Sequence, residues 1–490
     1  MISGNYIPDQ VSRIHLIAIC GTGMAALACM LKDMGYAVTG SDVGIYPPVS
    51  LLLESHHIPV MMGYDPAHLD HRPDLIVVGN AVSRNNPEII GMIESKIPYC
   101  SMPQAINQFA ARNRRSVVVA GTHGKTTTSS LIAWILHSAG LDPSFIIGGI
   151  LKNFGSNYRC GHGDIIVLEG DEYDTAFFDK KSKFLHYTPY RAVLTGIEFD
   201  HADIFTGINQ IELAFQEFLH RIPDDGKLFA FDSGISIEAV LNSGQSVFDR
   251  YGQNPASRWC ARNLILDSSG MQFDVFHAGS LFGHYKTPLL GRHNVWNALA
   301  AIAVADSIDI SKDITASAIA SFQGVRRRQE IRGCVNGVTV MDDFAHHPTA
   351  VQETILAVKP HCSDGRLIAV FEPGTHTSMR AIFQNTYPAA FLGADEVCIR
   401  KPSRIEKVPL QERLSPEKLV EDMNDIGLNA QLFPDTQSIV RHLVQTVRPN
   451  DIVLIMSNSG FDNIHQHLID RLIDSKPQGI NDELCVNSLD

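Results

Sequence analysis

The sequence SVVVAGTHGKTTT at residues 116–128 decides the fold of this chain. Its β-branched run predicts a buried strand, which passes through a short glycine turn into a long helical pattern. The unpaired N–H groups and the dipole of a helix N-terminus both favour an anion at such a turn. Gly121 and Gly124 allow the backbone to approach phosphate oxygens, Lys125 supplies a cation, and Thr126 supplies a hydroxyl group for Mg²⁺. The pattern, GxxGKT, is a shortened variant of the GxxxxGK[ST] phosphate loop.

The same succession of apolar strand, glycine turn and helix recurs along the chain, which is typical of parallel α/β domains. It begins first at residues 14–31, and apolar strands that suggest a third unit follow at 338–344, 366–373, 396–401 and 451–460. We predict three α/β domains: a Rossmann-like domain at 1–108, a central phosphate-loop domain at 109–325 and a C-terminal Rossmann-like domain at 326–490. Short alternating strands between about 224 and 290 predict a small antiparallel sheet appended to the central domain.

Composition narrows the class of protein. The 490 residues carry a net charge of −13, which argues against general nucleic-acid binding, and 44% hydrophobic residues exclude disorder for most of the chain. Nine scattered cysteines without a CxxC pair indicate reduced thiols and a cytoplasmic location. His15 and the small residues around Gly21 and Gly23 interrupt the apolar stretch 14–31, so we expect a strand and a helix there, not a membrane segment. The polar tail, 475–490, is expected to be disordered.

Two further strand ends carry ligands that suit a metal. The strand DIIVLEGDEYD (164–174) ends in Glu169, Asp171, Glu172 and Asp174, and the segment GIEFDHAD (196–203) ends in Asp200, His201 and Asp203. Mg²⁺ prefers oxygen ligands and bridges phosphates, so these acids fit beside a phosphate loop. A solvated acidic loop and a purely structural histidine are the alternatives that these residues leave open.

The first strand leads into ICGTGMAALA, which reads as a G-x-G-x-x-A turn. Alone, this turn indicates NAD or FAD binding, and a dinucleotide-dependent oxidoreductase is one alternative. That alternative leaves the phosphate loop at 116–128 unexplained. A nucleotide-binding scaffold without turnover is another, against which the paired acids and His201 argue.

Taken together, the motifs resemble the Mur ligase family of peptidoglycan synthesis over nearly the whole chain. They are GTHGKTTT, EGDEYD, DHAD, GRHNVWNALAAIA (291–303), GVRRRQE and DDFAHHPTA (342–350), in this order. The resemblance implies an ATP- and Mg²⁺-dependent amide ligase in which ATP converts a carboxylate into an acyl phosphate that an amine then attacks. It further implies a cytoplasmic monomer or weak homodimer that binds neither nucleic acid nor membrane.

Three segments refine the expected substrate. IAICGTGMAALA, SDVGIYPPVSLLLE (41–54) and FFDKKSKFLHYTP (177–189) resemble the family members that attach L-alanyl-γ-D-glutamyl-meso-diaminopimelate to UDP-N-acetylmuramate during peptidoglycan recycling. The alternative within the family is the ligase that adds L-alanine to the same acceptor in de novo synthesis.

The resemblance also implies a role for each matching residue. Catalytic roles fall on Lys125, His201 and His347. ATP contacts fall on Gly121, Thr122, His123, Gly124, Lys125, Thr126, Thr127, His293, Asn294, Asn297 and Arg328. The magnesium ligands are Thr126 for one ion and Glu169 with His201 for a second. UDP-sugar contacts fall on Gly21, Thr22, Gly23, Met24, Asp42, Asn80 and Ser83, and peptide contacts on Asp342, His346 and Arg380. We expect Asp342, Asp343, His346 and His347 to lie in a loop after a strand, facing the cleft.

Two departures from the family pattern matter. Where recycling ligases read EPRSNTM, this chain has FEPGTHTSM (371–379), so Gly374 and His376 replace an arginine and an asparagine. An arginine there would pair with a peptide carboxylate, and we expect that contact to be lost or to shift to Arg380. Some Mur ligases carry a modified lysine after the DHxD segment that bridges their two metal ions. The corresponding helix, expected here at 210–220, has no lysine, so we predict no carbamylated side chain.

Overall fold

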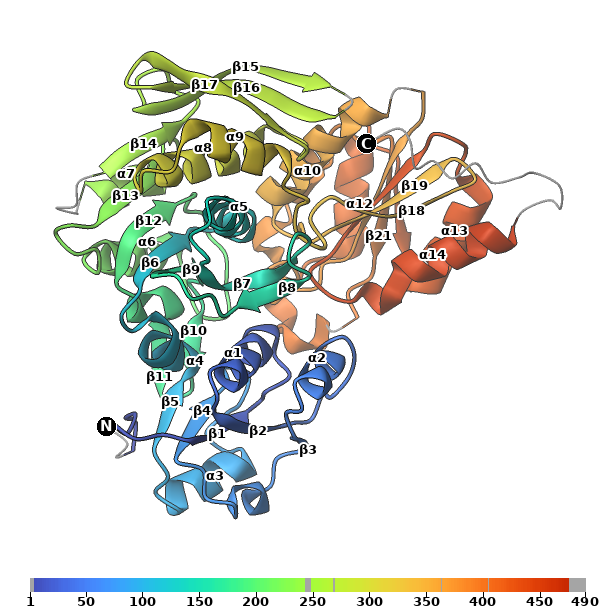
Figure 1. The fold of residues 1–490 in the computed structure, drawn as a ribbon. Coiled ribbons are helices and arrows are strands. Elements are labelled where there is room, and N and C mark those ends of the chain that lie inside the picture. Colours follow the sequence, from blue (N-terminus) through green and yellow to red (C-terminus); the bar gives the residue numbers. More distant parts are fainter. Residues whose placement is uncertain (1–3, 243–247, 268, 363, 404, 476–490) are drawn as a thin grey trace.

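The computed structural model describes residues 4–475 except 243–247, 268, 363 and 404, and it contains three separate main sheets (Figure 1). The C-terminal tail for which the sequence predicts disorder lies outside the described residues, apart from Ser475. Sheet residues fall between 13 and 101, 115 and 287, and 330 and 456. The predicted α/β class is therefore confirmed, whereas the domain limits at 108/109 and 325/326 stay a prediction.

The first sheet is parallel, with the strand order β3-β2-β1-β4-β5. Its strands are β1 Arg13–Ile17, β2 Ala37–Asp42, β3 Val60–Met62, β4 Leu75–Val78 and β5 Tyr99–Ser101. Its helices are α1 Thr22–Asp33, α2 Val49–Ser55, α3 Pro87–Glu94 and α4 Met102–Ala105. The stretch 14–31 thus forms a buried strand and a buried helix, as predicted. A π-helix, Ile106–Ala111, leads from α4 to the second sheet.

The second sheet has ten strands in the order β17-β16-β15-β14-β13-β12-β6-β9-β7-β8. The strands are β6 Arg115–Ala120, β7 Ser144–Leu151, β8 Ser156–Arg159, β9 Ile165–Gly170, β12 Pro189–Leu194, β13 Lys227–Phe231, β14 Phe248–Gly252, β15 Trp259–Asp267, β16 Gly270–His277 and β17 Ser280–Thr287. A separate hairpin joins β10 Asp174–Ala176 to β11 Asp179–Ser182. The helices are α5 Lys125–Ser138, α6 Ile208–Leu219, α7 Ile235–Leu241, α8 Arg292–Asp306 and α9 Lys312–Ala320.

Strand β6 explains why 116–128 specifies this domain. Val117, Val118, Val119 and Ala120 are all fully buried, as in a central parallel strand that is covered on both faces. The strand pairs in parallel with β12 on one side and β9 on the other, so three strand ends meet at the phosphate loop. The acidic ends of β9 and β12 are thereby brought to Lys125, although they lie far apart in the sequence.

The antiparallel strands predicted between 224 and 290 are present, but they do not form a separate sheet. Strand β15 pairs in parallel with β14 through Tyr251–Trp259 and Gly252–Cys260, and β16 and β17 follow antiparallel. The expectation of an appended small sheet is corrected accordingly: the strands continue the main sheet. Their pairing covers the edge that β14 would otherwise expose.

The third sheet has the order β18-β19-β23-β20-β21-β22, and only β18 is antiparallel to its neighbour. The strands are β18 Glu330–Val335, β19 Val338–Asp343, β20 Leu367–Phe371, β21 Glu396–Arg400, β22 Ala430–Phe433 and β23 Ile452–Met456. The helices are α10 Pro348–Val358, α11 Tyr387–Ala390, α12 Pro416–Asp425, α13 Thr436–Thr446 and α14 Ile464–Asp474.

The expected loop position of Asp342 and Asp343 is wrong, because both residues end strand β19 and are buried. Asp342 lies 3.2 Å from His465 Nε2 and pairs with Arg327 at 3.4 Å. Asp343 accepts the N–H groups of Gln329 and Ala345 at 2.8 and 2.7 Å. These partners allow two carboxylates to stay inside the domain. A peptide contact of Asp342 would require its ion pairs to open.

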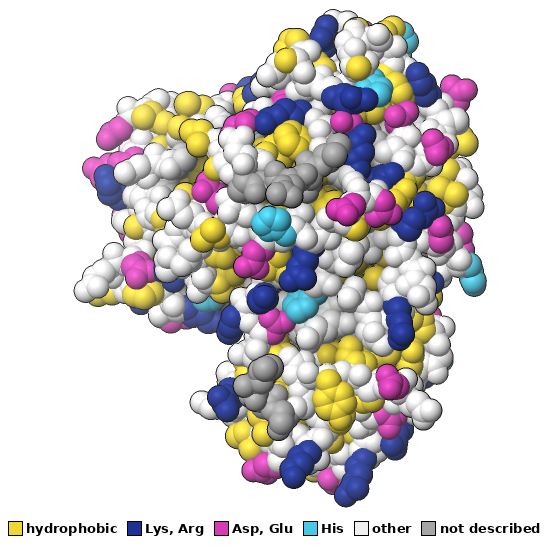
Figure 2. Space-filling view, turned by 90° about the vertical axis from the view of Figure 1, so that its left-hand side faces the viewer, with side chains coloured by type: hydrophobic (Ala, Val, Ile, Leu, Met, Phe, Trp, Pro, Cys, Tyr) yellow, Lys and Arg dark blue, Asp and Glu magenta, His cyan; other side chains and the backbone are white. Residues whose placement is uncertain are grey.

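The surface carries charges of both signs. Figure 2 shows Lys and Arg side chains mixed with Asp and Glu over one face, where the first domain forms a separate lower lobe. In the described part of the chain, none of the helices has the length and apolar character that crossing a bilayer requires.

Candidate active site

The phosphate loop requires glycine at two positions. Gly121 has φ = 129° and Gly124 has φ = 77°, in the left-handed region that disfavours other residues. A Cβ atom on Gly121 would lie 2.4 Å from Thr195 Oγ1, and one on Gly124 would lie 2.4 Å from Asn297 Oδ1. The Thr122 N–H donates to Gly196 O at 2.8 Å, which fastens the loop to the end of β12. The loop is therefore packed tightly against two neighbouring elements before any ligand arrives.

Lys125 lies inside this loop at the first position of α5. Its Nζ donates to Gly121 O at 2.6 Å, to Thr122 O at 3.3 Å and to Glu172 Oε2 at 2.7 Å. Burial lowers the pKa of this ammonium, but the Glu172, Asp171 and Glu169 carboxylates outweigh it and raise the pKa overall. The loop thus holds a charged ammonium next to a helix N-terminus, where both favour phosphate oxygens.

The acids that follow β9 divide into two groups. Glu169 accepts the Thr126 hydroxyl at 3.1 Å and the Gly148 N–H at 2.7 Å. Asp171, Glu172 and His201 place one possible ligand atom each within 4.8 Å of one another, and His201 Nε2 lies 3.3 Å from Glu172 Oε1. We predicted Glu169 and His201 as partners at one ion, whereas in this structure Glu172 is the carboxylate that contacts His201.

His201 occupies a special position at the end of the segment after β12. Its φ is 56°, which is unusual for a residue other than glycine and is common at functional sites. Burial lowers its pKa, but the Glu172 carboxylate outweighs burial and raises the pKa to about 9. At neutral pH the imidazole therefore carries the charge that neutralises Glu172.

Asp171 pairs with a basic residue, Lys183, which the sequence did not assign to the site. Lys183 Nζ lies 2.5 Å from Asp171 Oδ2. Burial raises the pKa of Asp171, yet Lys183 and Lys125 together hold it well below its usual range. Both Lys183 and Glu172 stand within motifs quoted from the sequence. Lys183 meets Asp171 because the β10–β11 hairpin folds back, whereas Glu172 meets Lys125 and His201 because β9 and β12 both pair with β6.

The two asparagines predicted to face adenine do lie on one face of α8. Asn297 donates to Asn294 Oδ1 at 3.0 Å and accepts the Thr128 hydroxyl at 3.1 Å. Asn294 in turn donates to Leu290 O at 2.8 Å. Asn297 therefore links the phosphate-loop helix α5 to α8, and an adenine contact would add to this structural role.

His293 and Arg328, the other residues predicted near the base, lie against third-domain residues. His293 Nδ1 lies 3.6 Å from Glu353 Oε2, and the Arg328 guanidinium lies 4.8 Å from the centre of the Phe344 ring. The contact set predicted for ATP thus extends from the phosphate loop to the junction with the third domain.

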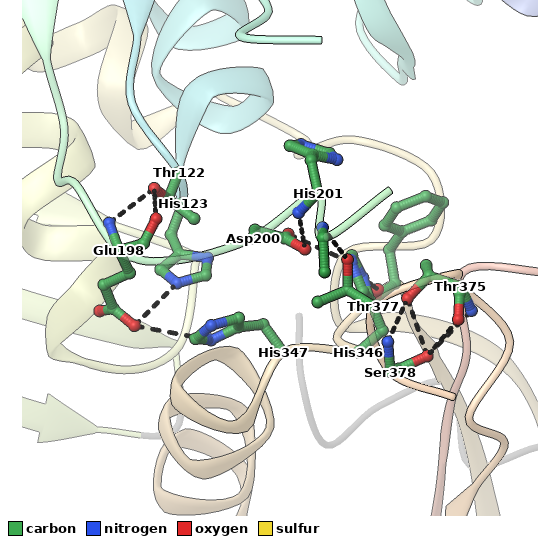
Figure 3. A network of polar contacts seen from close by, with 12 residues as sticks. Thr122, His123, Glu198, Asp200, His201, His346, His347, Thr375, Thr377 and Ser378 are labelled. Atoms are coloured by element: carbon green, nitrogen blue, oxygen red, sulfur yellow. Dashed lines mark hydrogen bonds and ion pairs between the residues drawn. The ribbon is translucent and has the colours of Figure 1, made fainter. Parts of the chain in front are cut away.

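Glu198 connects the phosphate loop with the third domain (Figure 3). Its Oε2 accepts the Thr349 hydroxyl at 2.6 Å, and it lies 3.4 Å from His123 Nε2 and 3.6 Å from His347 Nδ1. Its backbone N–H donates to the Thr122 hydroxyl at 2.9 Å. Sequence reasoning did not select Glu198, because it depends on two histidines that lie 75 residues before it and 149 after it in the sequence.

The segment after β12 makes further contacts with the third domain. The Ala202 N–H donates to Thr377 Oγ1 at 3.1 Å, and His346 Nε2 lies 3.8 Å from Asp200 Oδ2 (Figure 3). His347 Nε2 lies 3.3 Å from Phe199 O, and its Nδ1 accepts the Thr349 N–H at 3.3 Å. Thr377 belongs to the FEPGTHTSM segment, which therefore reaches the site.

Two positions in and near that segment bear on peptide binding. A Cβ atom on Gly374 would lie 3.0 Å from Asn458 Oδ1, so a larger side chain would require Asn458 to give way. Arg380, the predicted substitute for the missing arginine, pairs with Glu412. Its guanidinium would have to leave this partner to meet a peptide carboxylate.

The residues predicted for UDP lie at the carboxyl ends of β1, β2 and β4. Gly21 precedes α1, and the Met24 side chain is buried in the core, so only the backbone of Met24 is available there. Asp42 accepts the N–H groups of Cys20 and Gly44, both at 2.9 Å, and so shapes the turn. Asn80 and Ser83 follow β4. The strand order reverses between β1 and β4, and the carboxyl ends of strands at such a reversal are the usual ligand site of an open parallel sheet.

His347 gives the stability of the molecule a predictable pH dependence. Burial and the neighbouring His123 lower the pKa of His347 to about 4, against 6.5 in an unfolded chain. Because the unfolded chain then binds the proton more tightly, stability rises as the pH increases from about 4 to 6.5 and this contribution is complete above that range. We expect His347→Gln to reduce the rise in melting temperature between pH 4 and pH 6.5 by about 2–4 °C.

The matched control is His162→Gln, because the His162 side chain is 96% exposed. A His347→Gln profile parallel to that of the unsubstituted protein between pH 4 and 6.5 would contradict the assignment. Both profiles are measured by thermal unfolding without nucleotide.

Comparison with known proteins identifies the family. The Mur ligase family catalytic domain matches residues 13–114, the Mur ligase middle domain matches 119–305, and the Mur ligase glutamate ligase domain matches 327–459. The UDP-N-acetylmuramate–L-alanyl-γ-D-glutamyl-meso-2,6-diaminoheptandioate ligase of Escherichia coli is 40% identical over 94% of this chain and 98% of its own length. The chain belongs to the Mur ligase family. The family resemblance stated from the sequence is thereby confirmed.

Two other comparisons place this Mur ligase among its relatives. A murein peptide ligase of Psychrobacter arcticus has a crystal structure with a TM-score of 0.72 and 34% identity, covering 96% of this chain and 100% of that one. The UDP-N-acetylmuramate–L-alanine ligase of Anaeromyxobacter is 33% identical over 91% of this chain and 95% of its own length. As a Mur ligase, the protein is an ATP-dependent enzyme that forms a C–N bond. Its G-x-G-x-x-A turn belongs to the matched first domain, so the oxidoreductase alternative is not needed.

Proposed function

We propose that this Mur ligase joins UDP-N-acetylmuramate to the tripeptide L-alanyl-γ-D-glutamyl-meso-diaminopimelate in peptidoglycan recycling. The observation that carries the proposal is the 40% identity with a ligase named for this tripeptide, against 33% for one named for L-alanine. Both relatives match almost full length, so the difference is not an effect of coverage. The L-alanine ligase activity is the alternative.

The phosphate loop supports a specific arrangement of ATP. The triphosphate would follow the backbone of residues 121–127, with Lys125 at the β- and γ-phosphates. The adenine would lie toward His293, Asn294, Asn297 and Arg328, where the middle and third domains meet. This direction agrees with the position of Lys125 at the end of the loop nearest the acids.

The side chains beside the loop fit Mg²⁺, because they offer mainly carboxylate and hydroxyl oxygens. Thr126 would hold one ion and Glu169 with His201 a second, and Glu172, at 3.3 Å from His201, adds a carboxylate to this set. The ions, when bound, supply charge neutralisation for the phosphate groups. Lys125 would contact phosphate oxygens in place of Glu172.

The remaining chemistry is mostly positioning. The muramate carboxylate attacks the γ-phosphate to give an acyl phosphate and ADP, and the peptide amine then attacks the carbonyl and releases phosphate. The contacts of Glu198, His347 and Thr377 would hold the third domain over the loop and keep water from the acyl phosphate. His347 uses both ring nitrogens in these contacts, which supports a positioning role; its action as the amine base stays a prediction.

The substrate assignment is tested by supplying UDP-N-acetylmuramate and ATP with either the tripeptide or L-alanine and measuring phosphate release. We expect kcat/KM to be about 100-fold higher with the tripeptide, since the site would use binding energy that L-alanine cannot supply. A reaction without UDP-N-acetylmuramate controls for ATP hydrolysis. Equal or faster turnover of L-alanine would assign the chain to the alternative.

A further inference from the structure

The third domain has a polar cavity at the amino ends of its strands, on the opposite side of the sheet from the active site. The cavity has a volume of about 420 Å³, and its lining includes Arg366, Glu396, Gln431 and His442. Arg366 precedes β20 and Glu396 begins β21, whereas the residues that face the middle domain follow the carboxyl ends of β19 and β20. A five-residue strand such as β21 separates the two ends of the sheet by about 16 Å.

Three potential metal ligands converge beside this cavity. Glu396 and Cys398 are two residues apart on β21 and so lie on one face of the sheet, and His442 reaches them from α13. His442 Nε2 lies 2.6 Å from Glu396 Oε1, and Cys398 Sγ lies 4.0 Å from the same oxygen. One ligand atom from each residue lies within 4.8 Å of the other two.

The two oxygens of Glu396 face different partners. Glu396 Oε2 lies 3.2 Å from Arg366 Nη1, while Oε1 faces His442 and Cys398. Arg366 is also paired with Asp451 at 2.7 Å, so its charge is already balanced. Glu396 is 3% exposed and Cys398 is fully buried. The cluster is thus largely shielded from water, while the cavity gives access to Glu396 and His442.

We propose that Glu396, Cys398 and His442 form a binding site for one divalent transition-metal ion of the Zn²⁺ class, with a water molecule from the cavity as fourth ligand. Bond lengths of about 2.0–2.3 Å to O, N and S in a tetrahedral site place the ligand atoms about 3.3–3.5 Å apart. Each observed separation therefore changes by no more than about 1.5 Å.

Charge and ligand type support this class of ion. The Cys398 thiol would lose its proton on binding, so that the thiolate and the Glu396 carboxylate neutralise a divalent ion, while Asp451 neutralises Arg366. Thiolate and imidazole select Zn²⁺-like ions, whereas Mg²⁺ prefers the oxygen ligands found near Lys125. The second site therefore differs from the active site in both position and ion.

The test uses the full-length protein, freed of metal by a chelator and titrated with Co²⁺. We expect one equivalent of Co²⁺ to produce thiolate-to-metal charge-transfer absorption and the visible bands of a tetrahedral ion. Zn²⁺ should displace it. The Co²⁺ that binds oxygen and nitrogen ligands in the active site gives no sulfur band, so the readout reports the cysteine cluster alone.

Variants make the test specific. Cys398→Ser should lose the sulfur band, and His442→Gln should weaken Co²⁺ binding by at least about 10-fold. Cys100→Ser, which changes another fully buried cysteine, should keep the band unaltered. If Cys398→Ser does not fold, the proposal is tested with His442→Gln alone. The readouts are then the affinity for Co²⁺ and the rise in melting temperature on adding Zn²⁺. Absence of the sulfur band in the unsubstituted protein, or unchanged affinity in His442→Gln, overturns the proposal.

Discussion

Replacing Lys125 with alanine is expected to lower kcat for ATP-dependent amide formation by about 10³-fold, the largest effect of any single substitution that we predict. The ammonium is 2.6 Å from Gly121 O and 2.7 Å from Glu172 Oε2, at the N-terminus of α5. A phosphoryl transfer that depends on positioning and charge neutralisation loses most of its rate when this cation is removed. The measurement is the rate of phosphate release and of product formation at saturating substrates.

The matched control is Lys180→Ala. Lys180 also forms an ion pair with an acid that follows β9, at 2.6 Å from Asp174, but its side chain is 68% exposed. We expect this variant to keep its rate within about 3-fold of the unsubstituted enzyme, because exposed pairs contribute little. Lys125→Ala with its full rate of amide formation would show that the phosphate loop is assigned wrongly.

The second large effect is expected at Glu172, which is paired with Lys125 and His201 and is 2% exposed. Glu172→Gln leaves both cations without their main counter-charge. We expect it to lower the free energy of unfolding by about 2–3 kcal/mol without nucleotide, since removing one member of a buried pair leaves an uncompensated charge. Chemical denaturation with fluorescence detection measures the change.

Two further variants test the cause of that loss. Glu238→Gln removes an acid from an exposed pair with Arg250 and should cost at most about 1 kcal/mol. Lys125→Met combined with Glu172→Gln should recover part of the stability, because it removes the unpaired ammonium as well. If the double variant is as unstable as the two single losses added together, the coupling between Lys125 and Glu172 is absent.

Where the structure has the local conformation that the sequence predicted, local chemistry was sufficient. Gly121, Gly124 and Lys125 follow a buried strand and precede a helix, and the conformations of the two glycines require that residue type. The acids after β9 and the DHAD segment were assigned to neighbouring strand ends, and both strands do pair with β6. These features depend on residues that are close in sequence or on a parallel sheet with one functional edge.

Where the prediction was incomplete, the missing information was the identity of long-range partners. Glu172, not Glu169, contacts His201, because Glu169 is held by Thr126 and the backbone of Gly148. The sequence placed Asp342 in a loop, yet it ends strand β19, where it pairs with Arg327 and lies beside His465.

The sequence by itself therefore determined the α/β class, the glycine turn between strand β6 and helix α5, and the family, because each depends on residue types in a short, ordered pattern. Only the tertiary structure decided which carboxylate meets which cation, and that Glu198 joins His123 to Thr349 across two domains. It also decided that Glu396, Cys398 and His442 lie together, with Glu396 and His442 lining a cavity. The physical reason is that an ion pair or ligand set needs atoms within a few ångströms, and the packing of helices on sheets sets those distances for residues far apart in the chain.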